Sequence, residues 1–164
     1  MTRILFVCLG NICRSPTAEG VFRRLAAAEG LPVEVDSAGT GDWHVGKPPY
    51  PPATRAALAR GVDISGLRAR QATAEDFARF DLIVAMDGEN AADLENLRPS
   101  GNTTPVRRMM DFAPGAGLDV PDPYFTRDFE GALDLVELAA TGLADALRDG
   151  QFRQNASAVC PNLW

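Results

Sequence analysis

The sequence predicts a single α/β domain, with helices on both faces of a doubly wound, mainly parallel sheet of about four strands. Three observations support this prediction. Short, continuous apolar runs occur along the chain, and such runs are typical of strands buried on both faces. Segments with helix signals separate these runs, which favours a parallel sheet. The length of 164 residues fits one domain with a sizeable core, and neither a repeat nor a linker divides the chain.

The first strand and the first helix have the clearest signals. The strand is predicted at residues 3–8, which read RILFVC. The helix is predicted at residues 15–30, because Ser15 suits the N-cap, Pro16 suits the first helical position and Gly30 suits the end. A short loop joins the two elements.

The remaining elements alternate along the chain. Two loops rich in Gly and Pro, at residues 39–52 and 117–131, interrupt them. Further strands are predicted at residues 33–38, 81–86 and 105–112, and further helices at residues 53–61, 73–80 (capped by Thr73), 88–97 and 128–148 (weakened by Gly131 and Gly142). Residues 1–150 are predicted to form the domain, and residues 151–164 a tail that is partly flexible because it shows no clear period.

Composition and charge exclude several classes of function. A net charge of −6 argues against general binding to nucleic acid or to acidic membranes. No run reaches the ~18 apolar residues of a membrane span, and the N-terminus lacks the features of a signal peptide. Three cysteines, an odd number, do not form a disulfide framework. The sequence therefore predicts a cytoplasmic protein that binds neither nucleic acid nor membranes.

The stretch VCLGNICRSP, residues 7–16, is predicted to bind an oxyanion. It lies between a strand and a helix, and a helix N-terminus offers unpaired N–H groups and positive dipole charge to an anion. Gly10 allows close approach of the backbone, and Asn11 tolerates the left-handed conformation of a tight cradle. The fork of Arg14 can bind two phosphate oxygens.

In such a cradle Cys8 would face the anion as a thiolate nucleophile. On local sequence alone, a buried core cysteine remains an alternative. Zinc binding is disfavoured, since only His44 and the distant Cys160 could complete a site with Cys8 and Cys13. A structural disulfide is disfavoured in the cytoplasm, although a reversible Cys8–Cys13 disulfide under oxidation stays open.

Two further segments bear on the chemistry. GDWHVGK at residues 41–47 matches the start of a nucleotide-binding P-loop, but Pro48 replaces the required Ser or Thr, so we reject nucleotide binding. Asp122, between Pro121 and Pro123, is a candidate general acid for a leaving oxygen. An ordinary turn aspartate is the alternative for Asp122.

Taken together, these motifs resemble the low-molecular-weight protein tyrosine phosphatases. The resemblance covers roughly residues 2–150 and follows the order and spacing of that family. It rests on VCLGNICRSP at residues 7–16, DSAGT at 36–40, ARQ at 69–71, FDLIVAMD at 80–87 and DPY at 122–124.

The resemblance implies a hydrolase of phosphotyrosine, in proteins or small aryl phosphates, that releases inorganic phosphate. Cys8 would form a cysteinyl-phosphate, Arg14 would hold the phosphate, and Asp122 would act as general acid and then as general base. No metal or organic cofactor is expected, and the protein is expected to be a monomer or to self-associate weakly.

The resemblance also implies supporting roles. Ser15 would donate to the Cys8 thiolate, and Asn11, bonded in part to Ser37, would hold the loop shape. Ile12, Trp43 and Tyr124 would form apolar walls around the phenyl ring. Backbone N–H groups would bind phosphate oxygens at Leu9, Gly10, Asn11, Ile12, Cys13 and Arg14.

One departure concerns a histidine that the family often carries in a Ser-His-x-Ala-Arg-Gln stretch, where it helps to anchor the loop asparagine. Here the stretch is SGLRARQ, with Gly66 expected in its place. The lone histidine, His44, is expected at the pocket rim, where it would touch substrate peptides without a catalytic role.

Three other functions are disfavoured. Arsenate reductase relatives need further cysteines, and none lies between Cys13 and Cys160. Phosphoarginine phosphatases of this family tend to carry threonine where Ile12 stands. A non-catalytic phosphate-binding module would need no combination of Cys8, Arg14 and Asp122.

Overall fold

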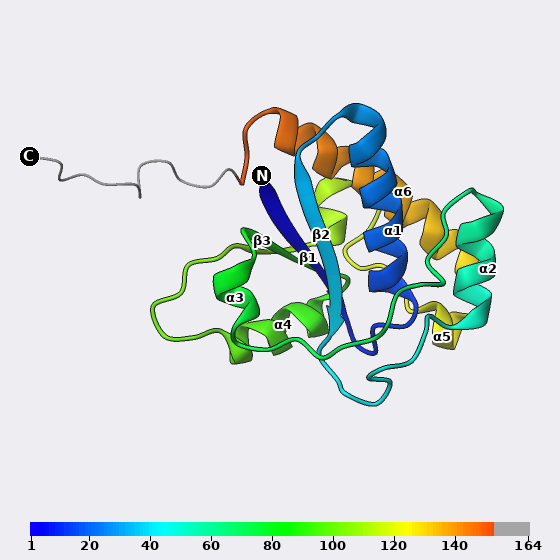
Figure 1. The fold of residues 1–164 in the computed structure, drawn as a ribbon, viewed down its shortest axis with the longest axis horizontal. Coiled ribbons are helices and arrows are strands. Elements are labelled where there is room, and N and C mark those ends of the chain that lie inside the picture. Colours follow the sequence, from blue (N-terminus) through cyan, green and yellow to red (C-terminus); the bar gives the residue numbers. More distant parts are fainter. Residues whose placement is uncertain (153–164) are drawn as a thin grey trace, which may run out of the picture.

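The computed structural model describes residues 1–152 as a sheet between two layers of helices (Figure 1). In this part of the chain the sheet has four strands, all parallel, in the order β2-β1-β3-β4. They are β1 (Thr2–Cys8), β2 (Val33–Gly39), β3 (Leu82–Ala85) and β4 (Val106–Arg108). The predicted doubly wound α/β fold is confirmed.

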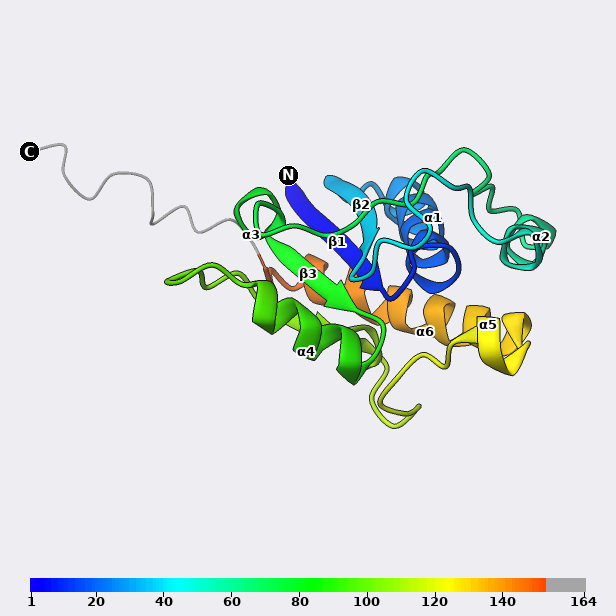
Figure 2. The same ribbon diagram turned by 90° about the horizontal axis from the view of Figure 1, so that it is seen from below.

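Helices cover both faces of the sheet, as Figure 2 shows. On one face, α1 and α6 lie side by side, with α2 packed against α6. On the other face, the side chains of α3 and α4 complete a second, smaller core. The helices are α1 (Arg14–Glu29), α2 (Pro51–Ala59), α3 (Asp76–Arg79), α4 (Gly88–Leu97), α5 (Pro123–Thr126) and α6 (Phe129–Arg148), with a 3-10 turn, η1 (Met109–Phe112).

The central strand β1 explains why the sheet is covered on both sides. Its residues from Ile4 to Val7 are fully buried. Because side chains alternate along a strand, Ile4 and Phe6 enter the core under α1 and α6, whereas Leu5 and Val7 enter the core under α3 and α4. The strand ends at Cys8, at the carboxyl edge of the sheet.

This edge is where a ligand site is expected. From β1, the chain first adds β2 on one side and later β3 and β4 on the other. The connections therefore diverge between β1 and β3, and ligands of open α/β sheets bind outside the carboxyl ends of the strands at such a point. The loop after Cys8 and the turn after Ala85 both lie there.

Two predicted N-caps are wrong. Helix α1 begins at Arg14, one residue before Ser15, and its N-cap Cys13 makes no side-chain capping bond. The hydroxyl of Ser15 is instead used by neighbouring loop residues, described below. Helix α3 begins at Asp76, and Thr73 does not cap it; the backbone N–H of Thr73 donates to the Asp76 carboxylate.

The loop and glycine predictions also need correction. Helix α2 begins at Pro51, inside the predicted loop, because proline suits the first helical positions. The second predicted loop contains the short helix α5. Gly142 is no weak point of α6: a Cβ there would clash with the carbonyl oxygen of Phe112, so glycine permits α6 to pack on η1.

No helix within residues 1–152 is long and apolar enough to cross a membrane. The predicted flexible tail, including Cys160, lies outside the described residues apart from Gln151 and Phe152.

Candidate active site

The site is built around the cysteine loop, residues 8–14, which joins β1 to α1. Cys8 is buried, and its Sγ accepts a hydrogen bond from the backbone N–H of Asn11 at 3.2 Å. The hydroxyl of Ser15 lies 3.0 Å from the same sulfur. Two groups that can donate hydrogen bonds thus lie against the sulfur, which sits just before the N-terminus of α1. The loop therefore provides an environment for an activated cysteine.

Asn11 adopts the predicted left-handed conformation, with φ of 57°. Its buried side-chain amide contacts three separate parts of the fold. Nδ2 donates to Ser15 Oγ at 2.8 Å and to Ser37 Oγ at 3.0 Å. Oδ1 accepts from the backbone N–H of Arg70 at 3.0 Å. The expected bond between Asn11 and Ser37 is thus present, and these bonds offset the cost of the left-handed backbone.

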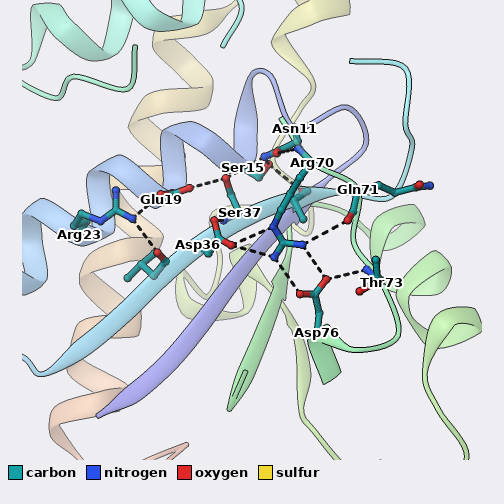
Figure 3. Close-up of polar contacts among 12 residues, drawn as sticks. Asn11, Ser15, Glu19, Arg23, Asp36, Ser37, Arg70, Gln71, Thr73 and Asp76 are labelled. Atoms are coloured by element: carbon teal, nitrogen blue, oxygen red, sulfur yellow. Dashed lines mark hydrogen bonds and ion pairs between the residues drawn. The ribbon is translucent and has the colours of Figure 1, made fainter. Parts of the chain in front are cut away.

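A buried carboxylate stands behind this amide (Figure 3). The hydroxyl of Ser37 donates to Glu19 Oε1 at 2.7 Å, and Arg23 pairs with Glu19 Oε2 at 2.6 Å. Arg23 also donates to the carbonyl of Val35. A buried carboxylate needs such partners. The local sequence pattern around Glu19 gives no sign of this network.

Arg14 is buried, and two hydrogen-bond acceptors hold its guanidinium in place. Its Nη1 donates to Asp87 Oδ2 at 2.7 Å and to the carbonyl of Val120 at 3.0 Å. Nη2 lies 3.5 Å from Asp122 Oδ2. Burial acts to lower the pKa of Arg14, but the charges of Cys8 and Asp122 and the bond to Asp87 outweigh it and raise the pKa above its usual value. The guanidinium is therefore a fixed cation.

Asp87 was missed by the sequence reasoning. A signal was available, because this carboxylate directly follows the predicted third strand and so had to lie at the same sheet edge as Cys8.

Asp122 reaches the site from the far end of the chain. It is the N-cap of α5, and its Oδ1 accepts the backbone N–H of Tyr124 at 3.1 Å. Its neighbours Pro121 and Pro123 restrict the backbone. The side chain is 24% exposed, so the carboxyl group is accessible from the cavity while its position is fixed.

Cys8, Arg14 and Asp122 line one cavity of about 240 Å³. Every predicted site residue lines it except Asn11 and Ser15, whose buried side chains bond to each other. His44 and Phe125 complete the lining, so His44 is at the predicted position. The lining consists of Cys8, Leu9, Gly10, Ile12, Cys13, Arg14, Trp43, His44, Asp122, Tyr124 and Phe125.

The outer walls of the cavity are aromatic. Trp43 is 66% exposed and Phe125 73% exposed. The ring of Tyr124 packs against Tyr50, with centroids 5.4 Å apart. Arg127 donates to the hydroxyl of Tyr50 at 2.8 Å and lies over both tyrosine rings. The mouth can therefore accept a flat apolar group above an anion-binding floor.

The two cysteines of the loop differ in chemistry. Burial, followed by the charges of Cys8 and Asp122, raises the pKa of the Cys13 thiol to about 12. Cys13 is therefore a neutral thiol near pH 7. Both cysteines are free, and a reversible Cys8–Cys13 disulfide stays a prediction.

The residue assigned to the family histidine needs correction. In Ser-His-x-Ala-Arg-Gln, counting back from Ala69 places Leu67 at the histidine position, one residue after Gly66. Leu67 packs against the apolar core, whereas Gly66 is exposed and has no atom within 4 Å of an added Cβ. Neither supports Asn11, which is anchored by Ser15, Ser37 and Arg70.

Comparison with known proteins agrees with this geometry. Residues 3–153 match the family model of the low molecular weight phosphotyrosine protein phosphatases. The chain belongs to this family. It is therefore an enzyme of the phosphatase class, and the resemblance seen in its motifs is confirmed.

Individual family members cover nearly the whole chain. The chain is 42% identical over 151 residues to the low molecular weight protein-tyrosine-phosphatase YfkJ of Bacillus subtilis, which covers 90% of this chain and 97% of that protein. The crystal structure of YfkJ superposes with a TM-score of 0.86, covering 92% of this chain and 98% of YfkJ. A phosphatase of the same family from Streptomyces coelicolor is 46% identical over 158 residues, with 90% and 94% covered.

One solved structure that resembles this chain has a name that states a different substrate. The crystal structure of a Drosophila arginine phosphatase superposes with a TM-score of 0.85 at 28% identity, covering 92% of this chain and all of that protein, to the nearest percent.

Proposed function

We propose that this phosphatase hydrolyses phosphotyrosine through a cysteinyl-phosphate intermediate. One observation carries the proposal: Cys8, Arg14 and Asp122 line a single cavity with aromatic walls. A nucleophile, a fixed cation and a proton donor are the groups that phosphoryl transfer needs.

In the first step, the thiolate of Cys8 attacks phosphorus and the bond from phosphorus to the tyrosine oxygen breaks. Asp122, in its acid form, gives its proton to that oxygen, so tyrosine leaves neutral. Arg14 and the backbone N–H groups of the cysteine loop bind the three other phosphate oxygens and stabilise the charge that develops on them.

In the second step, water attacks the cysteinyl-phosphate. The carboxylate of Asp122 takes one proton from that water, and the bond between sulfur and phosphorus breaks. Inorganic phosphate leaves, and Cys8 returns to the thiolate. The Ser15 hydroxyl, 3.0 Å from the sulfur, supports the thiolate as leaving group.

The substrate is proposed to enter with its ring between Trp43 and Tyr124 and its phosphate on the loop. The apolar side chain of Ile12 at the cavity surface supports a phenyl ring over a polar guanidinium. Phosphotyrosine in a protein and small aryl phosphates are therefore the proposed substrates. Phosphoarginine is the competing substrate, because one solved structure that resembles this chain is named for it.

Arsenate reduction is not favoured. In this family that chemistry needs a relay of further cysteines, and residues 14–152 contain none.

Within residues 1–152 no cluster of His, Cys, Asp and Glu could hold a metal ion.

The remaining proposals concern the setting. The enzyme is proposed to act in the cytoplasm, without a metal or organic cofactor, as a monomer or a weak self-associate. The net charge of −6 supports the absence of nucleic-acid binding.

Kinetics of two variants test the proposal. Cys8→Ser should abolish activity while thermal unfolding stays near that of the wild type. Asp122→Asn should slow a phosphotyrosyl peptide more than p-nitrophenyl phosphate, whose leaving group needs no proton. Asp111→Asn, an exposed carboxylate outside the cavity, is the matched control. Near-normal turnover by Cys8→Ser, or faster hydrolysis of a phosphoarginine peptide than of the phosphotyrosine peptide, would contradict it.

A further inference from the structure

The segment after Ala69 crosses the carboxyl end of β2. The N–H of Gly39 donates to the carbonyl of Arg70, and the N–H of Ala72 donates to the carbonyl of Gly39, both at 2.8 Å. Gly39 and Gln71 thus form a parallel bridge. This bridge places the N–H of Arg70 against the cysteine loop, where it donates to Asn11 Oδ1 at 3.0 Å.

The side chain of Arg70 fixes this position (Figure 3). Its Nη1 and Nη2 donate to the two carboxylate oxygens of Asp76 at 3.1 and 3.0 Å. Its Nε donates to Asp36 Oδ2 at 3.1 Å. Asp76 is 1% exposed and also accepts the N–H of Thr73. A two-pronged bond to a buried carboxylate is among the most directional contacts that an arginine makes.

The bond from Arg70 fixes the oxygen end of the Asn11 amide. With Oδ1 held by an N–H donor, Nδ2 faces Ser15 and Ser37 and donates to both hydroxyl oxygens. The oxygen of Ser15 is then an acceptor toward Asn11, so its own hydrogen is available to the Cys8 sulfur at 3.0 Å or to the carbonyl of Ala38 at 3.3 Å.

A rotated amide would reverse this arrangement. Oδ1 would face Ser15 and accept the hydroxyl hydrogen, which would be withdrawn from the sulfur. Two contacts oppose such a rotation: the backbone N–H of Arg70, and the Ser37 hydroxyl, which donates to Glu19 and so needs an N–H donor from Asn11.

We propose that Arg70 is a positioning residue for the nucleophile: held by Asp36 and Asp76, its backbone N–H orients the Asn11 amide so that the Ser15 hydroxyl donates to the Cys8 sulfur. The proposal rests on the function proposed above for Cys8. It assigns a role in the reaction to an ion pair that lies outside the cavity.

Alkylation of Cys8 by iodoacetamide, followed against pH by mass spectrometry of its peptide, tests the proposal. In Arg70→Met, the pH of half-maximal alkylation should rise by about one unit, the equivalent of one hydrogen bond to a charged group. With p-nitrophenyl phosphate, kcat should fall about tenfold for the same reason, while KM changes less than about twofold. A merely structural role would not move the alkylation profile of a folded variant.

Two further variants keep the test decisive. Arg70→Met leaves Asp76 buried and unpaired, so the double variant Arg70→Met/Asp76→Asn removes that charge and should show the same shift. Arg98→Met is the matched control, because Arg98 is similarly buried and also pairs with a carboxylate and backbone carbonyls, but contacts no residue of the cysteine loop. It should lower the unfolding temperature without changing the alkylation profile.

A second double variant tests whether Arg70 acts through the Ser15 hydroxyl. In a Ser15→Ala background, Arg70→Met should cause no further shift, because the hydroxyl that it controls is gone. Additive shifts, or a wild-type profile in folded Arg70→Met or in the double variant, would overturn the proposal. If the wild-type protein hydrolysed no phosphate ester and the shifts still appeared, the proposed function would fail and the positioning of Cys8 would stand.

Discussion

At the scale of single residues, Asp87 serves two elements with its two oxygens. Oδ1 accepts the N–H of Asn90 at 2.7 Å as the N-cap of α4, and Oδ2 accepts from Arg14 at 2.7 Å. Arg14, which we propose binds phosphate, is therefore tied to the strand and helix beside it through Nη1, while its Nη2 lies 3.5 Å from Asp122. Such preorganisation means that the charge needs no reorientation during the reaction.

Replacing Asp87 by Asn removes the negative charge behind Arg14 and keeps the size of the side chain. We expect kcat/KM for p-nitrophenyl phosphate to fall about tenfold, the effect of weakening one hydrogen bond to a charged group. Asp93→Asn, an exposed position of the same helix, is the control and should keep wild-type kinetics. Equal kinetics for the two variants would show that Asp87 does not position Arg14.

The raised pKa of Cys13 predicts how the stability of the protein depends on pH. Its thiol pKa is raised to about 12 in the folded protein, against ~8.5 in an unfolded chain. A raised pKa means that the folded state disfavours the thiolate. The contribution of Cys13 to the free energy of unfolding is therefore fully present below pH ~8.5 and is lost as pH rises toward 12. Urea unfolding between pH 7 and 10 should show a steeper loss of stability in the wild type than in Cys13→Ala. Parallel curves would contradict the raised pKa.

At the scale of elements, the end of β2 shapes the cysteine loop. A Cβ on Gly39 would lie 2.7 Å from the carbonyl oxygen of Leu9 and 3.2 Å from the backbone N of Asn11. Both contacts are with backbone, which cannot move without displacing the loop. Close approach of two backbones is a reason for glycine in a strand.

We therefore expect Gly39→Ala to impair both phosphate binding and turnover, so that KM rises and kcat falls. Gly66→Ala is the matched control, because an added Cβ there meets no atom within 4 Å. Steady-state kinetics and the rise of unfolding temperature with added inorganic phosphate measure the two effects. An active Gly39→Ala variant that is still stabilised by phosphate would exclude this role of the β2 end.

Local patterns predicted β1 and α4 well, because burial periodicity and turn signals are properties of neighbouring residues. The strand predicted at residues 105–112 is too long: β4 ends at Arg108, and Met109–Phe112 form the 3-10 turn η1. Local patterns also failed at Ser15 and Thr73, where the local rule for an N-cap was overridden by partners from elsewhere. Ser15 contacts Cys8 and Asn11 only because the loop folds back over α1. The Arg70–Asp76 pair and the Arg14–Asp87 pair likewise require a register between segments that a single sequence does not specify.

At the scale of the whole molecule, strand order gathers the site. The order β2-β1-β3-β4 places the loop after β1, the turn after β3 and residues 120–122 at one edge of the sheet. The N–H of Val120 donates to the carbonyl of Met86 and holds the Asp122 segment there. An acidic protein of net charge −6 can therefore present a local cationic cradle. Cys8 and Asp122, the proposed nucleophile and acid, are far apart in sequence but line the same cavity.

The most direct test of this account is to identify the phosphorylated residue during turnover. The enzyme would be mixed with p-nitrophenyl phosphate, quenched by denaturation within one turnover, and mapped by mass spectrometry. If Cys8 is the nucleophile, a phosphate should appear on the Cys8 peptide in the wild type and in Asp122→Asn, and none in Cys8→Ser. Turnover without a phosphate on Cys8, or with one on another residue, would contradict it.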